Sequence, residues 1–403
     1  MVRLSYTLFG IVFLALAARE LSFAGSLNMK LIKAVLQGNS TASAVFSPHI
    51  LTNTMREFAK WTAGNTAAQI NKVMLFKTNN MQRAAKKTDI NTDYTDEIFE
   101  SSENFEPTNT DEDYRTNCED VSSLKDIQFR SMPDVIRIKS TWFVAKGVIP
   151  AAGTSAQVLD FKASKKALQV LNKWTAQTTN NRIKNFMKKT TPDMKIVVIT
   201  AAHYETEWQY RFNPKLTKKV NFYTSPTKTT PVDMMSLEGK FLYKYIKAVD
   251  ADVLQMPFKK NNLKMTILVP KKANGIGTLI QKLTKLHMRN LRLRGKAKTV
   301  SVQLPKFKID FEVDLKKPMQ NLGIRDLFKK ANFSQLATYK GVLKVDHIIQ
   351  RVVLDVNERG ALMAVAARSS PKREKFIVDR PFVFLLRQGN DVFFAGRVNF
   401  APK

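Results

Sequence analysis

The sequence predicts an α+β protein with a large hydrophobic core. Hydrophobic residues make up 44% of the 403 residues, which supports a sizeable core. Apolar residues recur with helical spacing at residues 29–36, whereas residues 352–356, 382–386 and 391–400 are rich in the β-branched and aromatic side chains that favour strands. Both kinds of secondary structure are therefore expected.

The N-terminus predicts a secretory signal peptide. Arg3 is followed by a short apolar run at residues 8–16, and Ala15-Leu16-Ala17 fits a small-residue cleavage site. We therefore expect residues 1–17 to be removed, with cleavage after Ala24 as the alternative. The apolar run is too short to cross a bilayer, so the sequence predicts a secreted, extracellular protein without a membrane segment.

Charge divides the chain into two regions of opposite sign. The net charge is +31, yet residues 89–126 contain 13 acidic and two basic residues. This stretch is poor in aliphatic residues, so we expect a disordered acidic insertion. The remainder of the chain is strongly basic, and it should attract polyanions in a manner that weakens with salt.

The sequence predicts no enzymatic activity. Motifs for a nucleophilic serine, a phosphate-binding loop, a dinucleotide site or a zinc peptidase are lacking. The four histidines have no metal-ligand spacing, so neither metal nor cofactor is expected. Cys118 is the single cysteine, which leaves a free thiol or pairing between molecules. The sequons at Asn39 and Asn332 predict a glycoprotein.

Short motifs along the chain resemble those of the serpin family, in the family's order. They are Val45-Phe46-Ser47-Pro48, Gly64-Asn65-Thr66-Ala67-Ala68-Gln69-Ile70, Val232-Asp233-Met234-Met235, Leu354-Asp355-Val356-Asn357-Glu358, Asp379-Arg380-Pro381-Phe382 and Phe394-Ala395-Gly396-Arg397-Val398. Length alone would favour two or three domains. The resemblance instead implies one domain over residues 25–403, with three β-sheets, about eight to nine helices and an exposed reactive-centre loop.

Individual elements follow from the same residues. Asn65 or Thr66 is a candidate N-cap for a helix, and residues 135–144 resemble a strand of the central sheet. The family places a helix before the next strand, but the gap here is too short, so that helix should be truncated or missing. Residues 171–183 match the long helix across the main sheet, and Asn181 stands where the family favours glycine, a swap that tolerates left-handed backbone. Residues 196–202 then form a central strand.

An exposed basic segment, residues 368–375, is predicted between buried strands, where function often resides. A disordered connection is the alternative interpretation. The resemblance implies that this loop is bait for a protease, which forms an acyl-enzyme before the cleaved loop inserts as a new strand of the main sheet. Cleavage candidates are Arg373, Arg368 and Lys372, because a trypsin-like pocket holds a carboxylate. Counting from the hinge favours Arg373, with Arg368 next.

Three departures bear on whether the loop can insert. The hinge residues are Glu358, Gly360, Ala361, Met363, Val365 and Ala367. Met363 is bulky at a position that should face the core, and the loop is about four residues, or ~13 Å, shorter than in typical inhibitors. The family's buried polar cluster corresponds here to Ser47, Thr200 and Gln350, of which Ser47 alone keeps the family residue; Ile50 replaces a further serine.

A basic stretch provides candidate sites for polyanions. Its residues are Lys282, Lys285, Arg289, Arg292, Arg294, Lys296 and Lys298. Some serpins bind glycosaminoglycans at this position and others through the helix that Arg83, Lys86 and Lys87 match; a solvated basic face is the alternative. Nucleic acid is not expected, because no recognition module is present.

These features together predict a secreted, monomeric inhibitor of a trypsin-like serine protease that works by suicide-substrate trapping. The altered hinge, short loop and changed cluster keep a second interpretation open. In that alternative the chain is a non-inhibitory serpin that binds or carries a ligand in an extracellular fluid. No motif in the sequence identifies the target protease.

Overall fold

The structure is a computed structural model. It describes residues 27–37, 42–74, 136–150, 156–181, 183–204, 207–286, 288–291, 293–334, 336–359 and 374–400. The predicted signal peptide, the acidic insertion at residues 89–126, Cys118 and Asn39 lie outside these residues and stay predictions. Within the described ranges, no helix is both long and apolar enough to cross a membrane.

The described residues contain six helices. Residues 27–36 are helical, and the others are α2 (Pro48–Trp61), α3 (Gly64–Met74), α4 (Ser164–Thr178), α5 (Ile276–Lys282) and α6 (Lys316–Leu322). Short 3-10 turns follow at η2 (Pro214–Leu216), η3 (Leu283–Lys285), η4 (Met288–Leu291) and η5 (Asp326–Phe328). The expected eight to nine helices refer to the whole chain, part of which is not described.

The strands form three sheets, as predicted. The central five-stranded sheet has the order β11 (Phe307–Asp314), β13 (Val345–Val356), β5 (Ile196–Tyr204), β2 (Ile136–Ala145) and β4 (Ala156–Leu159). The nine-stranded sheet has the order β1 (Ala44–Phe46), β16 (Asp391–Val398), β15 (Phe382–Gln388), β9 (Lys264–Pro270), β8 (Ala251–Pro257), β7 (Lys228–Ile246), β10 (Lys298–Pro305) and β14 (Glu374–Ile377), with β6 (Lys218–Ser225) also paired to β7. The third sheet pairs β12 (Ala337–Thr338) with β3 (Ile149–Pro150).

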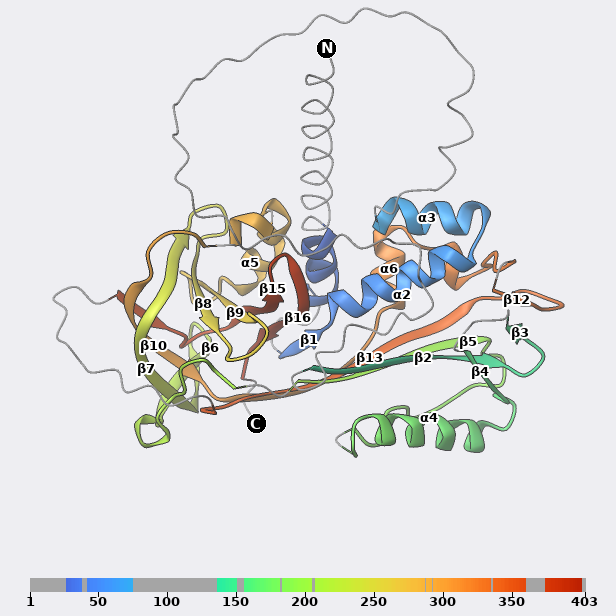
Figure 1. Cartoon of the computed structure of the whole chain (residues 1–403), viewed down its shortest axis with the longest axis horizontal. Helices are drawn as coiled ribbons and strands as arrows, with labels where there is room; N and C mark the ends of the chain where they lie inside the picture. Colours follow the sequence, from blue (N-terminus) through green and yellow to red (C-terminus); the bar gives the residue numbers. More distant parts are fainter. Residues whose placement is uncertain are drawn as a thin grey trace, which may run out of the picture. The chain divides into compact units, whose positions relative to one another are not determined.

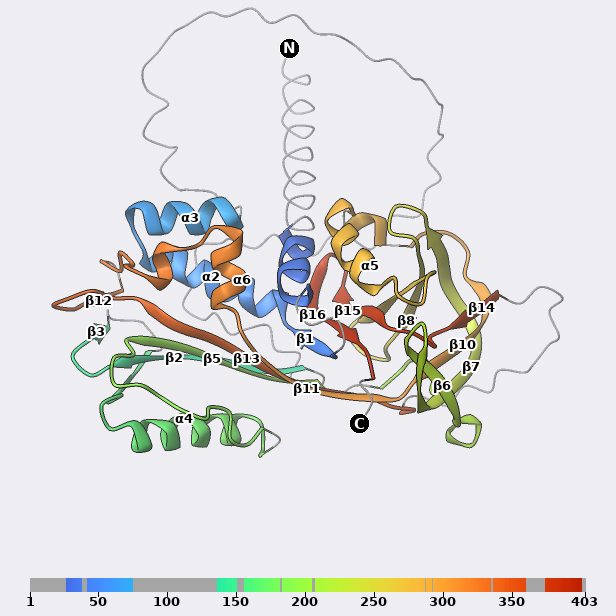
Figure 2. The same cartoon turned by 180° about the vertical axis from the view of Figure 1, so that it is seen from behind.

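Helices cover both faces of the five-stranded sheet. Figures 1 and 2 show α4 on one face, and α2, α3 and α6 on the other. Helix α4 buries Ala167, Leu171 and Thr175, which recur every fourth residue and so form one stripe. The ring of Trp174 meets Phe143 of β2 edge-on at 6.2 Å. The predicted helix across the main sheet is present, but it covers Ser164–Thr178 and ends before residues 179–183 of the predicted match.

The start of α2 follows its sequence closely. Ser47 is the N-cap, its hydroxyl accepts a hydrogen bond from the Ile50 backbone N–H (3.2 Å), and Pro48 occupies the first turn. The apolar side chains of Ile50, Leu51, Met55 and Phe58 are buried along one side of the helix. This packing fixes the position of Ser47 against β13 of the five-stranded sheet, where its backbone N–H donates to Gln350.

The predicted cap of α3 is wrong. The helix begins at Gly64, so Asn65 and Thr66 lie inside its first turn. Their side chains have partners far away in sequence instead: Thr66 accepts a hydrogen bond from the Asn332 backbone (3.1 Å), and Asn65 donates to Asp326 (2.6 Å). Tertiary contacts therefore use the polar groups that local sequence would assign to capping.

The predicted loss of a helix after β2 stays a prediction, because residues 151–155 lie outside the described residues. Residues 146–150 contain the short strand β3, and the described residues between β2 and β4 include no helix. Asn181 adopts a positive φ of 59°, the left-handed backbone expected where the family favours glycine.

Candidate functional site

The candidate loop joins two sheets. Strand β13 ends at Val356 in the five-stranded sheet, and the next described strand, β14, begins at Glu374 beside β10. The hinge residues Gly360, Ala361, Met363, Val365 and Ala367 lie outside the described residues, as do the cleavage candidates Arg368, Lys372 and Arg373. Their predicted roles stay predictions, whereas the supports at both ends of the loop can be described.

Glu358 is held at the point where the loop begins. Its side chain is 12% exposed, and it forms an ion pair with Lys306 at 2.9 Å. Its carboxylate also accepts a hydrogen bond from the Thr217 hydroxyl at 2.9 Å. Burial opposes ionisation of this carboxyl, but the hydrogen bonds from Lys306, its own backbone and Thr217 outweigh burial and lower the pKa of Glu358. The start of the loop is thus fixed by a charged group.

Trp208 fastens the backbone on either side of Glu358. Its indole N–H donates to the carbonyl of Asn357 (2.9 Å), and its backbone N–H donates to the carbonyl of Arg359 (3.0 Å). The indole is 3% exposed and stacks on Phe258 with ring centroids 4.4 Å apart. A rigid aromatic pair therefore anchors the end of β13.

Strands β13 and β5 form a parallel pair, and β13 ends shortly before the loop begins in the sequence. Val345 pairs with Ile196 and Leu354 with Tyr204, so the pairing runs the length of β5. A segment that follows β13 and folds back would run antiparallel to it. Such a strand could separate β13 from β5 and pair with both, because two parallel strands can each accept an antiparallel neighbour between them. The paired edges of β13 and β5, which we call the β13·β5 joint, are thus a site at which such a strand could be added.

Gln350 connects this joint to α2. Its side-chain carbonyl accepts a hydrogen bond from the Ser47 backbone N–H (3.0 Å), and its amide donates to the Ser47 carbonyl (3.3 Å). Gln350 is also the register partner of Thr200 on β5, whose hydroxyl donates to Ser140 of β2 at 3.0 Å. The structure therefore brings the three predicted cluster residues together. Ser140 completes the layer, and sequence reasoning missed it.

Two further side chains tie β13 to the chain on both sides. Arg351 donates to both carboxylate oxygens of Asp310 on β11 (2.7 and 2.9 Å) and to the carbonyl of Lys184 (3.2 Å), which precedes β5. At the far end of the joint, the buried Asp346 accepts hydrogen bonds from the backbone N–H groups of Lys195, which precedes β5, and Ile196, its first residue. Parting β13 from β5 must break the hydrogen bonds of Asp346 as well as the ladder, whereas the Arg351–Asp310 pair lies between β13 and β11 and need not break.

Comparison with known proteins identifies the family. The model of the family described as Serpin (serine protease inhibitor) matches residues 23–400. The chain belongs to the serpin family. It is 33% identical over 240 residues to Serine protease inhibitor 42Dd of Drosophila melanogaster. The match covers 58% of this chain and 63%, less than two thirds, of that relative.

Solved structures agree on the serpin fold. Serpin48, described as a highly specific serpin in the insect Tenebrio molitor, superposes with a TM-score of 0.73 at 24% identity and covers 94% of this chain and 98% of its own. Uncleaved ovalbumin superposes with a TM-score of 0.75 at 19% identity, over 94% of this chain and 99% of its own. At these identities the likeness supports the fold alone.

The predicted polyanion residues of this serpin do not share one helix. Lys282 ends α5, Lys285 ends η3, and Arg294, Lys296 and Lys298 follow in a loop and the start of β10. The side chain of Arg289 and the whole of Arg292 lie outside the described residues. Lys298 pairs with Glu374 at 3.3 Å, whereas Lys285, Arg294 and Lys296 are exposed. Polyanion binding here stays a prediction.

Asn332, the described sequon, is exposed and lies just after η5. Its side-chain carbonyl accepts a hydrogen bond from the Ser334 backbone at 3.2 Å. The asparagine is therefore at the surface, where a glycan could be attached. Glycosylation itself stays a prediction.

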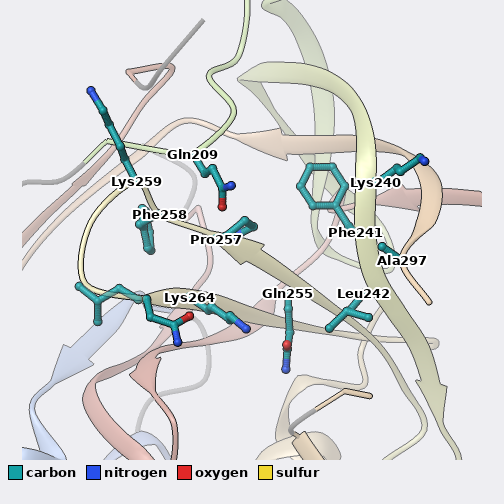
Figure 3. Close-up of a pocket in the computed structure, with 12 residues that line it drawn as sticks. Gln209, Lys240, Phe241, Leu242, Gln255, Pro257, Phe258, Lys259, Lys264 and Ala297 are labelled. Carbon is teal, nitrogen blue, oxygen red and sulfur yellow. The ribbon is translucent and has the colours of Figure 1, made fainter. Parts of the chain in front are cut away.

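A cavity of about 610 Å³ lies beside β7, β8 and β9. Figure 3 shows Phe241, Gln209 and Lys264 directed toward it, whereas Lys240 and Lys259 point outward at its rim. The walls are partly apolar, with Leu242, Pro257 and Phe258. None of the residues predicted from sequence lines this cavity, since no motif marked it.

Proposed function

We propose that this serpin inhibits a serine protease of the trypsin type by suicide-substrate trapping. The observation that supports this best is the direct parallel pairing of β13 with β5, immediately before the loop. The joint is closed, and an added antiparallel strand would satisfy the backbone groups of both neighbours. The chain also begins its loop from a fixed point, at Glu358 and Trp208.

The chemical step belongs to the protease. Its serine oxygen attacks the carbonyl carbon of the scissile residue, for which Arg373 is favoured over Arg368 and Lys372. The peptide C–N bond breaks, an ester to the serine forms, and the released amine takes the proton that the protease's histidine removed from the serine. The freed loop then enters the β13·β5 joint with the protease still attached, before water hydrolyses the ester.

The site of action is proposed to be extracellular. The support is the apolar run at residues 8–16 with its small-residue cleavage site, together with two sequons. We expect the secreted, processed chain to be the inhibitory form. N-terminal sequencing of the protein recovered from culture medium tests this, with a start at residue 18 or 25 expected.

A carrier function is the second candidate, and the cavity beside β7, β8 and β9 is the observation that favours it. Its volume lies within the range of small-molecule sites, and its walls combine apolar and polar side chains. In this case the hydrogen bonds of Asp346 to the backbone at the start of β5 would keep the β13·β5 joint closed, while Gln350 holds β13 to α2. Loop cleavage would then release the protease unharmed.

Incubation with trypsin separates the two functions. Inhibition predicts a covalent complex that survives boiling in SDS and whose mass is that of trypsin plus the chain cleaved at the loop. A carrier predicts a cleaved chain and fully active trypsin. Chymotrypsin is the control, because its pocket lacks the carboxylate that accepts a basic residue.

A further inference from the structure

Helix α4 and the segment after it form the centre of a basic surface that the proposed function does not use. Residues 161–192 contain eight lysine or arginine residues and no acidic residue. Acidic residues flank this stretch at Asp160 and Asp193. A stretch of this length with charges of one sign departs from the mixed signs of an ordinary soluble surface.

The lysines of α4 share its outer side. Ala167, Leu171 and Thr175 face the five-stranded sheet, whereas Lys165, Lys166 and Lys173 are exposed. Lys166 and Lys173 are seven residues apart, so they lie on one side of the helix about 10.5 Å apart along its axis. In Figure 1 this helix lies below the sheet, with its outer side turned away from the strands.

The segment after α4 adds lysines beside the same helix. The side chain of Asn172 accepts a hydrogen bond from the Met187 backbone N–H (2.8 Å) and donates to the Met187 carbonyl (3.1 Å). The Thr190 hydroxyl donates to the carbonyl of Ser164 at 3.1 Å. Residues 183–190 therefore run back along α4, and the exposed Lys188 and Lys189 lie beside its N-terminal half.

These charges are not neutralised by partners in the described part of the chain. Lys165, Lys166, Lys173, Lys188 and Lys189 form no ion pair there. The Glu312 carboxylate interacts electrostatically with Lys188, but it interacts with Arg351 as well. The surface thus has a surplus of positive charge.

Two of these lysines are placed where they destabilise the helix. The first turn of α4 has no acidic residue, and its N-cap, Ala163, offers no side-chain hydrogen bond. Lys165 and Lys166 stand at the positive end of the helix dipole, where anions stabilise and cations destabilise. A bound anion would relieve this repulsion. Local conflicts of this kind are expected where a surface serves binding.

We propose that α4 and residues 183–190 form a binding surface for a linear sulfated polysaccharide. Exposed lysines from two adjacent segments can contact successive sulfate groups of an extended chain. Base stacking is not provided, because Trp174 packs on Phe143 and Phe186 is buried. This surface is separate from the residues between Lys282 and Lys298, and its existence does not depend on protease inhibition.

The test compares two triple variants of the full chain with equal loss of charge. The first is Lys166→Gln, Lys173→Gln and Lys188→Gln. The matched control is Lys72→Gln, Lys247→Gln and Lys317→Gln, three exposed lysines on other elements. Heparin is the probe, and its dissociation constant is measured by titration at several salt concentrations.

The α4 variant should bind heparin about tenfold more weakly than the control variant, and the slope of log K against log salt should fall in size by about two. Equal weakening of the two variants would show that net charge alone is responsible and would overturn the proposal. Circular dichroism and thermal melting verify that both variants are folded, since all six substitutions are at exposed positions.

A third variant and a competitor decide where and what the surface binds. Lys282→Gln, Lys285→Gln and Lys296→Gln remove the same charge from the other basic stretch. If this variant loses more heparin affinity than the α4 variant, the α4 assignment is wrong. Duplex DNA and dextran sulfate are compared as competitors of heparin on the native chain, with DNA counted by its phosphate groups and dextran sulfate by its sulfate groups. If DNA displaces heparin at the lower concentration of charged groups, the polysaccharide assignment is wrong.

Discussion

The Glu358 carboxylate lies 2.9 Å from the Lys306 ammonium at the exit of β13. Lys306 sits between β10 of the nine-stranded sheet and β11 of the five-stranded sheet, so this pair connects the start of the loop to both sheets. Thr217 adds a second contact to the same carboxylate. Glu358, from which the loop would begin to insert, is therefore held in place by side chains from two other segments of the chain.

The first prediction is that Glu358 and Lys306 are energetically coupled. Glu358→Gln and Lys306→Gln should each lower the free energy of unfolding by about 1–3 kcal/mol, because each leaves a partly buried charged group without its partner. Their effects should be non-additive by at least ~1 kcal/mol in a double-mutant cycle followed by denaturant unfolding.

The exposed pair Lys219–Asp233, at 2.8 Å, provides the control for this cycle. Lys219→Gln and Asp233→Asn should add within about 0.5 kcal/mol, since exposed ion pairs contribute little. Additive effects at Glu358 and Lys306 would contradict the coupling inferred from their contact.

A second prediction concerns acid. The pKa of Glu358 is lowered in the folded chain, so its stabilisation is complete above the unfolded value of about 4.3 and is lost as pH falls through the folded pKa. The difference in Tm between the native chain and Glu358→Gln should be constant from about pH 7 to 5 and should close below about pH 4. A difference that persists or widens in acid would argue against a charged Glu358 at the hinge.

A third prediction concerns the buried layer. Gln350→Met removes both hydrogen bonds to the Ser47 backbone while keeping the size of the side chain. The Ser47 N–H is then left without its partner, whereas the Ser47 carbonyl keeps the hydrogen bond from the Leu51 N–H. The unsatisfied N–H should cost about 1–3 kcal/mol, measured as a lower midpoint in denaturant. Gln303→Met, at a half-buried position of β10, is the control and should have little effect. Equal midpoints for the two variants would show that the Gln350 bonds do not stabilise the joint.

Much of the fold could be predicted from local pattern. The strands at residues 352–356, 382–386 and 391–400 are present, because their alternating and continuous apolar runs match buried strands. Helix α4 is expected from the resemblance of residues 171–183 to a family helix, and the structure shows that its apolar residues form one stripe. Motifs that match a family over the whole chain also fixed the order of these elements.

The supports of the loop could not be predicted in the same way. Thr217 and Lys306 contact Glu358 from more than fifty residues away, and Ser140 joins Thr200 through the register of two strands. Sequence spacing does not encode such contacts. The error at Asn65 and Thr66 has the same origin, since distant partners used the side chains that local rules assigned to a cap.

A fourth prediction concerns the scissile bond. Arg373→Ala should slow formation of a trypsin complex far more than Arg368→Ala, because counting from the hinge favours Arg373 and a trypsin-like pocket requires a basic residue. Mass spectrometry of the cleaved chain locates the cut. Cleavage after Arg368 in the native chain would contradict the count from the hinge.

The central claim is that the cleaved loop enters between β13 and β5, and a disulfide across this joint tests it most directly. Ala202 and Val352 are buried register partners on the two strands, so Ala202→Cys and Val352→Cys, with Cys118→Ser, should allow one reversible crosslink. We predict that the oxidised protein is cleaved by trypsin without forming an SDS-stable complex, and that the reduced protein forms the complex. Equal complex formation by the oxidised and reduced proteins would contradict insertion at this joint.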